Sequence, residues 1–408
     1  MTKKNFLITA IILVCASGIF AQYGGIPFEI FHKTIGARAL SMGEACVGNP
    51  TGATGIFWNP AALDSLNKNE IYAGAELLFE GAHMEYLTYS TPIGKFGGLG
   101  IMAGYLGYGT YEVVDSSAVV TGNADLKDIF ISAAYGKNII AGYQAGVSLK
   151  MLIKSAADGT YPAFNADVSF YKSFEMVDIG IAFKNVLPIE VKYALDSEKF
   201  VSTLRAGAVL KLLDAKLKIA ADVEKYFINE NPVFFAGVEY RVVDMFAVRA
   251  GYNTFSDISG GIGINFQNMN LDYAVTYASS TLMHKIAISY EFGGYEASLR
   301  AEPEVFSPVG AIKKTYIRIT AAAKYEIYKW SLELKDKKGK IVRTWFGASI
   351  PDTEVVWDGL RDDGMPFEEG EYKALLTLVD ENDTVIKSKE LTIKIQTNDA
   401  RSIPMFGE

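Results

Sequence analysis

Cysteine and histidine are scarce in this sequence of 408 residues. It has two cysteines, Cys15 and Cys46, and its three histidines lie far apart along the chain. Zinc and histidine-rich metal sites need several such ligands at short spacing, so we expect no metal site. We also find no P-loop and no pattern that pairs a nucleophile with a base. We therefore expect no cofactor and no enzymatic activity.

Long apolar runs are also missing. A membrane-spanning helix needs about 20 consecutive apolar residues, and the only comparable stretch is the shorter run Phe6–Phe20. Two lysines precede this run and Ala21 follows it, which is typical of a secretory signal peptide over residues 1–21. The formal net charge of -8 argues against nucleic acid as a partner, because phosphate binding needs a basic face.

Glycine and aromatic residues are abundant, with 38 Gly, 23 Tyr and 24 Phe. Between Asn69 and Phe292 they occur in segments where apolar and polar residues alternate, separated by Gly, Asn, Asp and Ser. In Tyr143–Lys154, for example, Val147 and Leu149 alternate with polar neighbours. Period-two alternation predicts half-buried β-strands. We count about fourteen segments, an even number within the range of outer-membrane barrels.

The two faces of these segments differ in charge. One face is nearly free of charge, whereas the other carries Lys150, Asp167, Asp178, Arg205, Lys218, Asp222, Glu224, Glu239, Arg249 and Asp272. A soluble sandwich or propeller also has alternating strands, but a charge-free face suits lipid. We therefore predict a transmembrane antiparallel β-barrel of about 14 strands over residues 69–292. We expect its luminal charges to pair with one another and with Arg38 and Glu44, rather than to form an ion pathway.

The end of the barrel and the lengths of its connections predict its orientation. The last segment, with Tyr290 and Phe292 on its apolar face, resembles the aromatic-terminated final strand that the outer-membrane assembly machinery reads. Outer loops of such barrels are long and periplasmic turns are short. The long connections are Gly109–Asp125, Ser155–Tyr161 and Asn185–Lys199, and each follows an odd-numbered segment. Both barrel ends are therefore expected in the periplasm, together with everything that follows Phe292.

After Phe292 the composition changes. Residues 293–305 are charged and contain proline, which predicts a linker. Residues 306–397 contain soluble-type strand segments and predict a sandwich of about seven strands. Residues 398–408 are expected to form a tail. Three motifs of the sandwich resemble the FlgD-type immunoglobulin-like module: Phe306-Ser307-Pro308, Trp357-Asp358-Gly359 and Gly370-Glu371-Tyr372. Asp358, Asp362 and Asp363 have the oxygen ligands that calcium prefers, although a solvated turn explains them better.

Two motifs lie before the barrel. They read GARALSMGEA at Gly36–Ala45 and GIFWNPAAL at Gly55–Leu63. They resemble the N-terminal region of the PorV/PorQ family, which is related to FadL transporters, although Ala62 stands where many relatives have glycine. The resemblance implies fourteen strands and a segment, residues 22–68, that lies in the lumen as a plug. The plug-motif residues would be Arg38, Met42, Gly43, Asn59, Pro60 and Ala61.

The third segment, Phe96–Gly107, is rich in glycine. Its Gly98-x-Gly100-x-x-Ala103 pattern superficially matches a dinucleotide loop, but it lies inside a strand rather than before a helix. Glycines inside strands often mark bulges or close approaches. Gly97, Gly98, Gly100 and Gly104 therefore allow two interpretations: a kink where the barrel opens sideways to lipid, or room for the plug.

These observations leave three functions open. The PorV/PorQ resemblance implies a component of type IX secretion that binds cargo proteins or secretion machinery, and this is the hypothesis that we favour from sequence. The FadL relationship implies a transporter of apolar small molecules across the outer membrane. The third is a structural envelope protein. In each case the partners include the lipid of the outer membrane.

Overall fold

The computed structural model describes residues 33–396 except 79–80, 115–116, 118, 157–158, 193–196, 229–230, 256, 279–280 and 382. The expected signal peptide at 1–21, the start of the plug segment and the tail at 398–408 lie outside these residues. The chain divides into two units, Met1–Phe292 and Gly293–Glu408. Each is described by itself.

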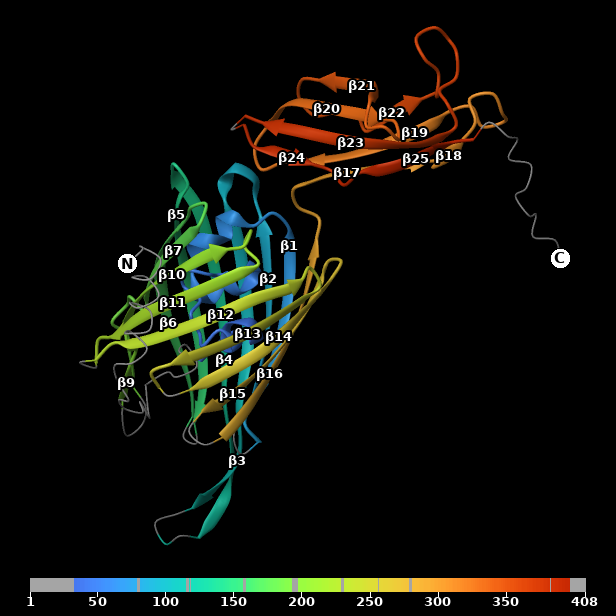
Figure 1. Ribbon diagram of the computed structural model, residues 1–408. Helices are drawn as coiled ribbons and strands as arrows, with labels where there is room; N and C mark the ends of the chain where they lie inside the picture. Colours follow the sequence, from blue (N-terminus) through green and yellow to red (C-terminus); the bar gives the residue numbers. More distant parts are fainter. Residues whose placement is uncertain are drawn as a thin grey trace, which may run out of the picture. The chain divides into compact units, whose positions relative to one another are not determined.

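Fourteen antiparallel strands of the first unit close into a barrel, as predicted (Figure 1). β1 pairs with β16 to close it, so that Asn69 lies opposite Phe292 and Leu77 opposite His284. A separate hairpin, β8 (Glu190–Lys192) and β9 (Ser197–Lys199), lies in the connection between β7 and β10. The barrel strands are β1 (Asn69–Leu77), β2 (His83–Pro92), β3 (Gly98–Val114), β4 (Val120–Ile140), β5 (Tyr143–Ala156), β6 (Gly159–Ser173), β7 (Val177–Lys184), β10 (Thr203–Leu212), β11 (Leu217–Tyr226), β12 (Val233–Val243), β13 (Phe246–Asn253), β14 (Ile258–Phe266), β15 (Met269–Ala278) and β16 (Thr281–Phe292).

The alternation in sequence becomes an apolar exterior and a polar interior. On β5, Val147 and Leu149 are 48% and 67% exposed, whereas Ser148 and Lys150 are buried in the lumen. The charged residues predicted on the polar face all point inward, and most are buried. A charge-poor exterior around a closed sheet leaves no unpaired strand edge in lipid, so the barrel is suited to span a membrane. Within the described residues, no helix has the length and apolarity to cross one.

The two ends of the barrel have different connections. At the end that holds Asn69 and Phe292, here called the turn end, tight turns such as Ile140–Tyr143 and Phe266–Met269 join the strands. The opposite end, the loop end, holds the connection between β7 and β10. The predicted long loops Gly109–Asp125 and Ser155–Tyr161 are wrong.

Residues 109–114, 120–125, 155–156 and 159–161 of those segments belong to paired strands. β3 and β4 stay paired out to Val114 and Val120, and the Thr110 hydroxyl donates to Asp125 at 2.6 Å. Similarly, Ser155 pairs with Thr160. Gly109, Gly122, Asp125 and Gly159, which indicated loops, are part of strands here, because neighbouring Thr, Tyr and Val residues favour the extended backbone.

The second unit consists of two sheets with a common apolar core. One has the order β17-β19-β22 and the other β18-β25-β23-β20-β21, with β24 paired to β23. Side chains of both sheets form one buried cluster. The strands are β17 (Glu296–Glu302), β18 (Val305–Phe306), β19 (Thr315–Ala322), β20 (Ile327–Lys335), β21 (Ile341–Gly347), β22 (Glu354–Trp357), β23 (Gly370–Asp380), β24 (Val385–Lys387) and β25 (Leu391–Ile395). The FlgD-type, immunoglobulin-like assignment stays a prediction.

The expected linker at 293–305 is wrong for most of its length, because it contains β17 and the start of β18. Leu299 and Ala301 pack on the core, whereas Arg300 and Glu302 point outward. The linker prediction failed because a short edge strand with charged residues on its outer face has the same composition as a linker. Its pairing with β19 cannot be identified from the segment itself.

The Trp357-Asp358-Gly359 motif lies at the centre of the second unit. Trp357 is buried and makes edge contacts with Phe306 and Tyr372, each with ring centroids 5.2 Å apart. Gly359 has φ +68, and a Cβ there would meet Pro308 at 2.6 Å. Asp358 accepts the backbone N–H of Leu360 at 3.0 Å. The motif therefore closes a turn against the core.

The two other candidate calcium ligands have protein partners as well. Asp362 pairs with Arg343 at 2.7 Å, and Asp363 accepts the N–H of Met365 at 2.9 Å. A carboxylate that bonds the N–H two residues on forms an Asx turn. These contacts support the solvated-turn interpretation of the three aspartates.

Tyr372→Phe should lower the free energy of unfolding of the second unit by about 1 kcal/mol. The buried phenol donates to the Glu368 carbonyl at 2.7 Å, and burial raises the pKa of Tyr372, so it remains a donor at neutral pH. Tyr328→Phe is the control, because its hydroxyl donates to Asp383 at the exposed surface. Urea unfolding of the full chain, followed by tryptophan fluorescence, measures both. Equal losses in the two variants would contradict the prediction.

Candidate functional site

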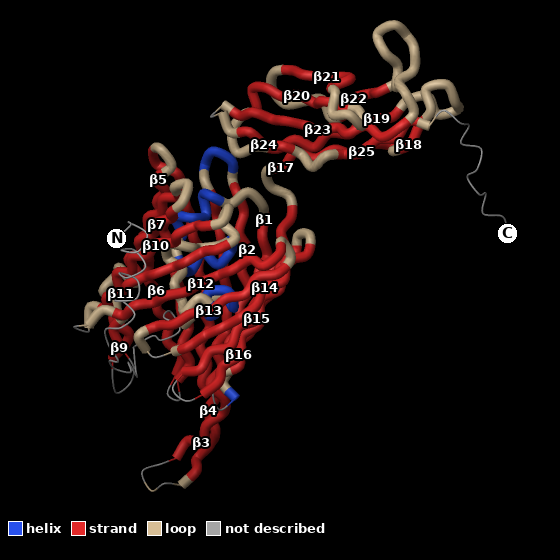
Figure 2. The backbone as a smooth tube through the Cα atoms, in the orientation of Figure 1, coloured by secondary structure: helices blue, strands red, loops and turns tan. Residues whose placement is uncertain are grey.

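Residues 33–66, which precede β1 and are described by the structure, lie in the barrel lumen and form a plug. Figures 1 and 2 show its short helices among the barrel strands. They are α2 (Ala37–Ser41), η2 (Gly52–Thr54), α3 (Gly55–Trp58) and η3 (Pro60–Ser65). α2 contacts β13 to β16, and η3 contacts β2 to β6. Helices this short are not stable alone, so contact with the barrel must hold their shape.

The Asn59-Pro60-Ala61 block anchors η3 to the wall. The Asn59 amide donates to the Val47 and Phe170 carbonyls, both at 3.0 Å, while its oxygen accepts the Ala61 N–H at 3.2 Å. The Ala61 N–H also reaches the Ser169 hydroxyl at 2.9 Å. Asn59 is therefore both a helix cap and a bridge from the plug to β6.

The other plug-motif residues meet the opposite wall. Arg38 binds Glu239, with its Nε 2.8 Å from the carboxylate. The Gly43 N–H donates to the Ser259 hydroxyl at 3.2 Å. Met42 and Gly43 lie with their backbone against β12 and β13. The structure thus places all six motif residues in the lumen, divided between two attachment regions.

Luminal glycines make room for the plug backbone. A Cβ at Gly98 would lie 2.0 Å from the Leu63 carbonyl oxygen, and one at Gly146 would lie 2.1 Å from the Ala61 nitrogen. No side chain fits at such distances. Other strand glycines in similarly close contact with the plug backbone are Gly136, Gly180, Gly237 and Gly251.

Of the two interpretations of the glycines in the third strand, the kink is absent. From Gly98 to Gly107, β3 pairs with both β2 and β4 without a register shift. The alternative interpretation explains Gly98 and Gly100, which face Leu63 and Ile56 of the plug. Gly97 closely approaches the Gly136 carbonyl. A lateral opening at this strand is therefore wrong for this conformation, because close packing rather than flexibility requires these glycines.

Gly104 belongs to a row across four strands in which glycine and aromatic residues alternate. Gly74, Tyr86, Gly104 and Phe130 lie opposite one another on β1 to β4. The Tyr86 ring covers Gly74 and the Phe130 ring covers Gly104, where a Cβ would meet ring atoms at 2.2 Å. Aromatic cover of this kind stabilises glycine within a sheet. Outside, an apolar groove of about 740 Å³ lies over the same part of the wall.

A buried ionic cluster joins the plug to β10 and β11. Arg205 binds Asp222 at 3.0 Å and Glu224 at 3.2 Å, and its guanidinium carbon is 3.8 Å from the Phe235 ring centroid. Asp222 also accepts the backbone N–H groups of Cys46 and Val47, at 2.8 and 2.9 Å. One carboxylate therefore binds both the wall and the plug. The sequence gives no local signal for this second role.

The expectation of paired luminal charges agrees with the structure. Arg249 bridges Glu239 and Asp272, with both contacts at 2.7 Å, and Arg38 shares Glu239 from the plug. Glu44 takes part through its backbone, since Arg205 donates to its carbonyl oxygen. Such pairing offsets the cost of removing these charges from water.

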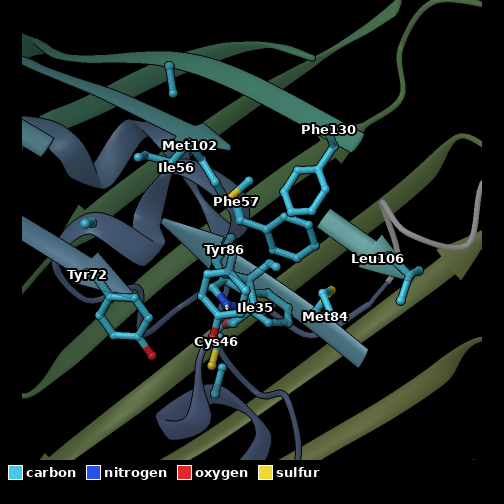
Figure 3. Close-up of a cluster of buried hydrophobic side chains, with 14 of the residues drawn as sticks. Ile35, Cys46, Ile56, Phe57, Tyr72, Met84, Tyr86, Met102, Leu106 and Phe130 are labelled. Carbon is cyan, nitrogen blue, oxygen red and sulfur yellow. Dashed lines mark hydrogen bonds between the residues drawn. The ribbon is translucent and has the colours of Figure 1, made fainter. Parts of the chain in front are cut away.

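On the loop side of the plug, part of the lumen is apolar, while the buried Lys285–Glu76 ion pair (2.9 Å) and Asp128 lie toward the same end. Met84, Met102, Leu106 and Phe130 point inward from β2, β3 and β4 and meet plug residues such as Phe57 (Figure 3). All of them are buried. These inward positions would be polar in a water-filled channel.

Part of the connection between β7 and β10 covers this apolar cluster. We call residues 185–202 the cap segment; its described parts are 185–192 and 197–202. Val191 and Phe200 are buried in the luminal cluster, and Ile189 packs against it. The cap segment therefore contributes side chains to the lumen, which the loop prediction for Asn185–Lys199 did not anticipate.

Polar contacts fix the base of the cap segment. The Asn185 oxygen accepts from Lys150 at 2.6 Å, and the Asn185 N–H donates to Asp167 at 2.8 Å. Lys150 and Asp167 themselves pair at 2.6 Å. Farther along, Lys154 binds Glu198 at 2.9 Å near the barrel mouth. The base is thus buried and firmly held, and the outer contact is partly exposed.

The terminal aromatic residues lie on the exterior at the turn end. Phe292 stacks with Tyr290 and Tyr89, at centroid distances of 5.8 and 6.5 Å. Tyr290 is 47% exposed. Aromatic clusters at this height are typical of the interfacial girdles of membrane barrels.

No family model matches the chain, and no curated protein matches it in sequence. Solved structures do resemble it. The toluene transporter TbuX of Ralstonia pickettii has 14% identity and a TM-score of 0.47 over 64% of this chain and 98% of that one. The toluene transporter TodX of Pseudomonas putida has 11% identity and a TM-score of 0.46, over 64% and 98%. A FadL homologue of Pseudomonas aeruginosa has 9% identity and a TM-score of 0.46, over 66% and 100%.

Proposed function

We propose that this chain is an outer-membrane β-barrel that passes apolar small molecules through its lumen. The observation that carries the proposal is the buried apolar cluster of Met84, Leu106 and Phe130 on the loop side of the plug. Barrel interiors in contact with water are polar. A buried apolar cluster in the lumen at the loop end suits a solute that leaves water as it enters.

The cap segment and the plug would control this passage. Val191 and Phe200 fill space that an apolar solute would occupy, so entry requires the cap segment to move. Its Lys154–Glu198 contact is partly exposed, and exposed ion pairs contribute only about 0–1 kcal/mol. Movement of the outer part of the cap segment is therefore inexpensive, whereas the buried contacts of Asn185 keep its base in place.

Uptake of two apolar probes tests the proposal. We expect the full chain in lipid vesicles to take up a monoaromatic hydrocarbon or a long-chain fatty acid faster than vesicles without protein. Val191→Asn should raise the rate of uptake at least about fivefold, because an unpaired polar group among apolar ones destabilises the closed position of the cap segment by about 1–3 kcal/mol. Leu187→Asn is the matched control: it is on the same segment but 40% exposed, and should change the rate less than about twofold. Uptake no faster than in protein-free vesicles would contradict the function.

A second candidate is the partner-binding role in type IX secretion that the PorV/PorQ resemblance implies. The observation in its favour is the paired extension of β3 and β4 at the loop end, where Tyr111, Val119 and Val120 are about half exposed. Exposed apolar residues on a protruding hairpin suit contact with a protein. Deleting residues 110–124 should reduce surface display of cargo while apolar uptake continues. Unchanged display would count against this role.

The second unit is proposed to lie in the periplasm. β16 ends at Phe292 on the turn end, and short turns belong to the periplasmic side of such barrels. Protease added to intact cells should leave residues 293–408 uncut, and should cut them once the outer membrane is permeabilised.

A further inference from the structure

A polar pocket of about 260 Å³ lies in the lumen toward the turn end. Plug residues line one side of it, including Arg38 and Asn49, and side chains of β1 and β11 to β16 line the other. Asn265 and Glu291 lie beside the last residues of β14 and β16, so the pocket is near the turn-end rim. It shares none of the loop-end residues Met84, Leu106 and Phe130 of the apolar cluster.

Cations with free donors lie on one side of this pocket. Lys218, Glu239 and Arg249 lie opposite one another on β11, β12 and β13. Arg38 and Arg249 bind Glu239 closely, which leaves the Lys218 ammonium 3.7 Å from it, beyond hydrogen-bond distance. Arg241, two residues after Glu239 on the same face, makes no ion pair with any residue that the structure describes.

The carboxylates on the opposite side already have partners. Glu70 accepts the Ala53 N–H at 2.7 Å, and Glu291 pairs with Lys68 at 3.3 Å. Asp272 is bound to Arg249. Each of these carboxylates therefore has a cation or N–H partner, whereas the Lys218 and Arg241 side chains have no hydrogen-bond partner among the described residues.

Asn49 is a further residue of the pocket with a hydrogen-bond donor that has no partner in the part of the chain that the structure describes. The residue is 5% exposed and lines the pocket. Its side-chain Nδ2 is buried and has no hydrogen-bond partner within the described chain. A buried donor left unsatisfied costs about 1–3 kcal/mol, a cost that rotation of the Asn49 amide toward an acceptor bound in the pocket would remove.

We propose that this pocket binds a small anion, a carboxylate or a phosphate, through Lys218, Arg241 and the Asn49 amide. Hydrogen bonds between an anion and charged donors are about twice as strong as neutral ones, and the pocket volume limits the ligand to a small solute. The inference concerns a different part of the lumen and a different ligand chemistry from the apolar passage, so either can fail without the other.

Titration calorimetry of the full chain in detergent tests the site with acetate, succinate and inorganic phosphate. We expect saturable binding of at least one of them, with Kd below about 10 mM. Lys218→Met should weaken that binding about tenfold or more, and Asn49→Ala at least about threefold. Lys218→Arg should retain it, because the charge and donors remain. The preferred probe distinguishes a carboxylate from a phosphate ligand.

Lys211→Met is the matched control. Lys211 and Lys218 are both luminal, with 18% of each side chain exposed, but Lys211 is bound to Asp178 at 2.7 Å and does not line the pocket. Its replacement should change binding less than about twofold. Three results would overturn the proposal. The chain could bind ethylammonium saturably but none of the anions, or it could bind no probe saturably. The third is that Lys211→Met and Lys218→Met weaken anion binding equally.

Discussion

Replacing Arg205 by alanine should destabilise the barrel by about 3–5 kcal/mol and release part of the plug. The change leaves two buried carboxylates, Asp222 and Glu224, without their shared cation. Removing one partner of a buried ion pair costs more than the pair itself contributes, because the remaining charge is uncompensated. Asp222 also holds the plug at Cys46 and Val47, so its protonation or movement would weaken that attachment.

Two measurements distinguish local from general damage in this variant. Urea unfolding in detergent gives the loss in free energy, and limited proteolysis reports access to the plug between Cys46 and Leu66. Arg241→Ala is the control, since it removes a luminal arginine without an ion pair among the described residues and should cost under about 0.5 kcal/mol. An Arg205→Ala barrel as stable and as protease-resistant as the unmodified one would show that the cluster is not needed.

Gly146→Val should prevent η3 from docking and lower barrel stability by about 3 kcal/mol or more. Even the first carbon of a side chain at this position would lie 2.1 Å from the Ala61 nitrogen, and the contact is with backbone, so a rotamer change cannot relieve it. The hydrogen bond from Ala61 to Ser169 must then break. We expect proteolysis within Pro60–Ser65 and a lower unfolding temperature.

Gly260→Val is the comparison for this substitution. Gly260 is also in a barrel strand, but a Cβ there would meet only the Arg249 carbonyl, at an ordinary 3.6 Å. Valine favours strands, so the barrel should keep or gain stability while the plug stays docked. Similar losses at Gly146 and Gly260 would mean that glycine flexibility, rather than room for the plug, is what the barrel needs.

Several features of the fold could be predicted from sequence because they depend on neighbours along the chain. The two faces of a strand follow from period-two alternation, so the inward charges of β5 and β11 and the outward apolar residues of β16 could be identified. The even number of segments and the apolar outer face together favoured a closed barrel. The Asn59-Pro60-Ala61 block could be singled out through its family resemblance.

Other features could not be predicted, because they depend on residues far apart in sequence. β17 was interpreted as a linker, since only its pairing with β19 makes it a strand. The glycines of β3 allowed two interpretations until Leu63 and Ile56 were found against them. Likewise, nothing near Val191 or Phe200 indicates that the cap segment enters the lumen.

The sequence by itself therefore determined which side chains face lipid and which face the lumen, because strand alternation is a local property. Only the tertiary structure decided which luminal residues meet. Closing fourteen strands brings Glu239 to Arg38 across 201 positions of sequence and Asp222 to Cys46 across 176. Those contacts depend on the register of the strands and the course of the plug. They place an apolar cluster toward the loop end of this barrel and a polar pocket toward the turn end.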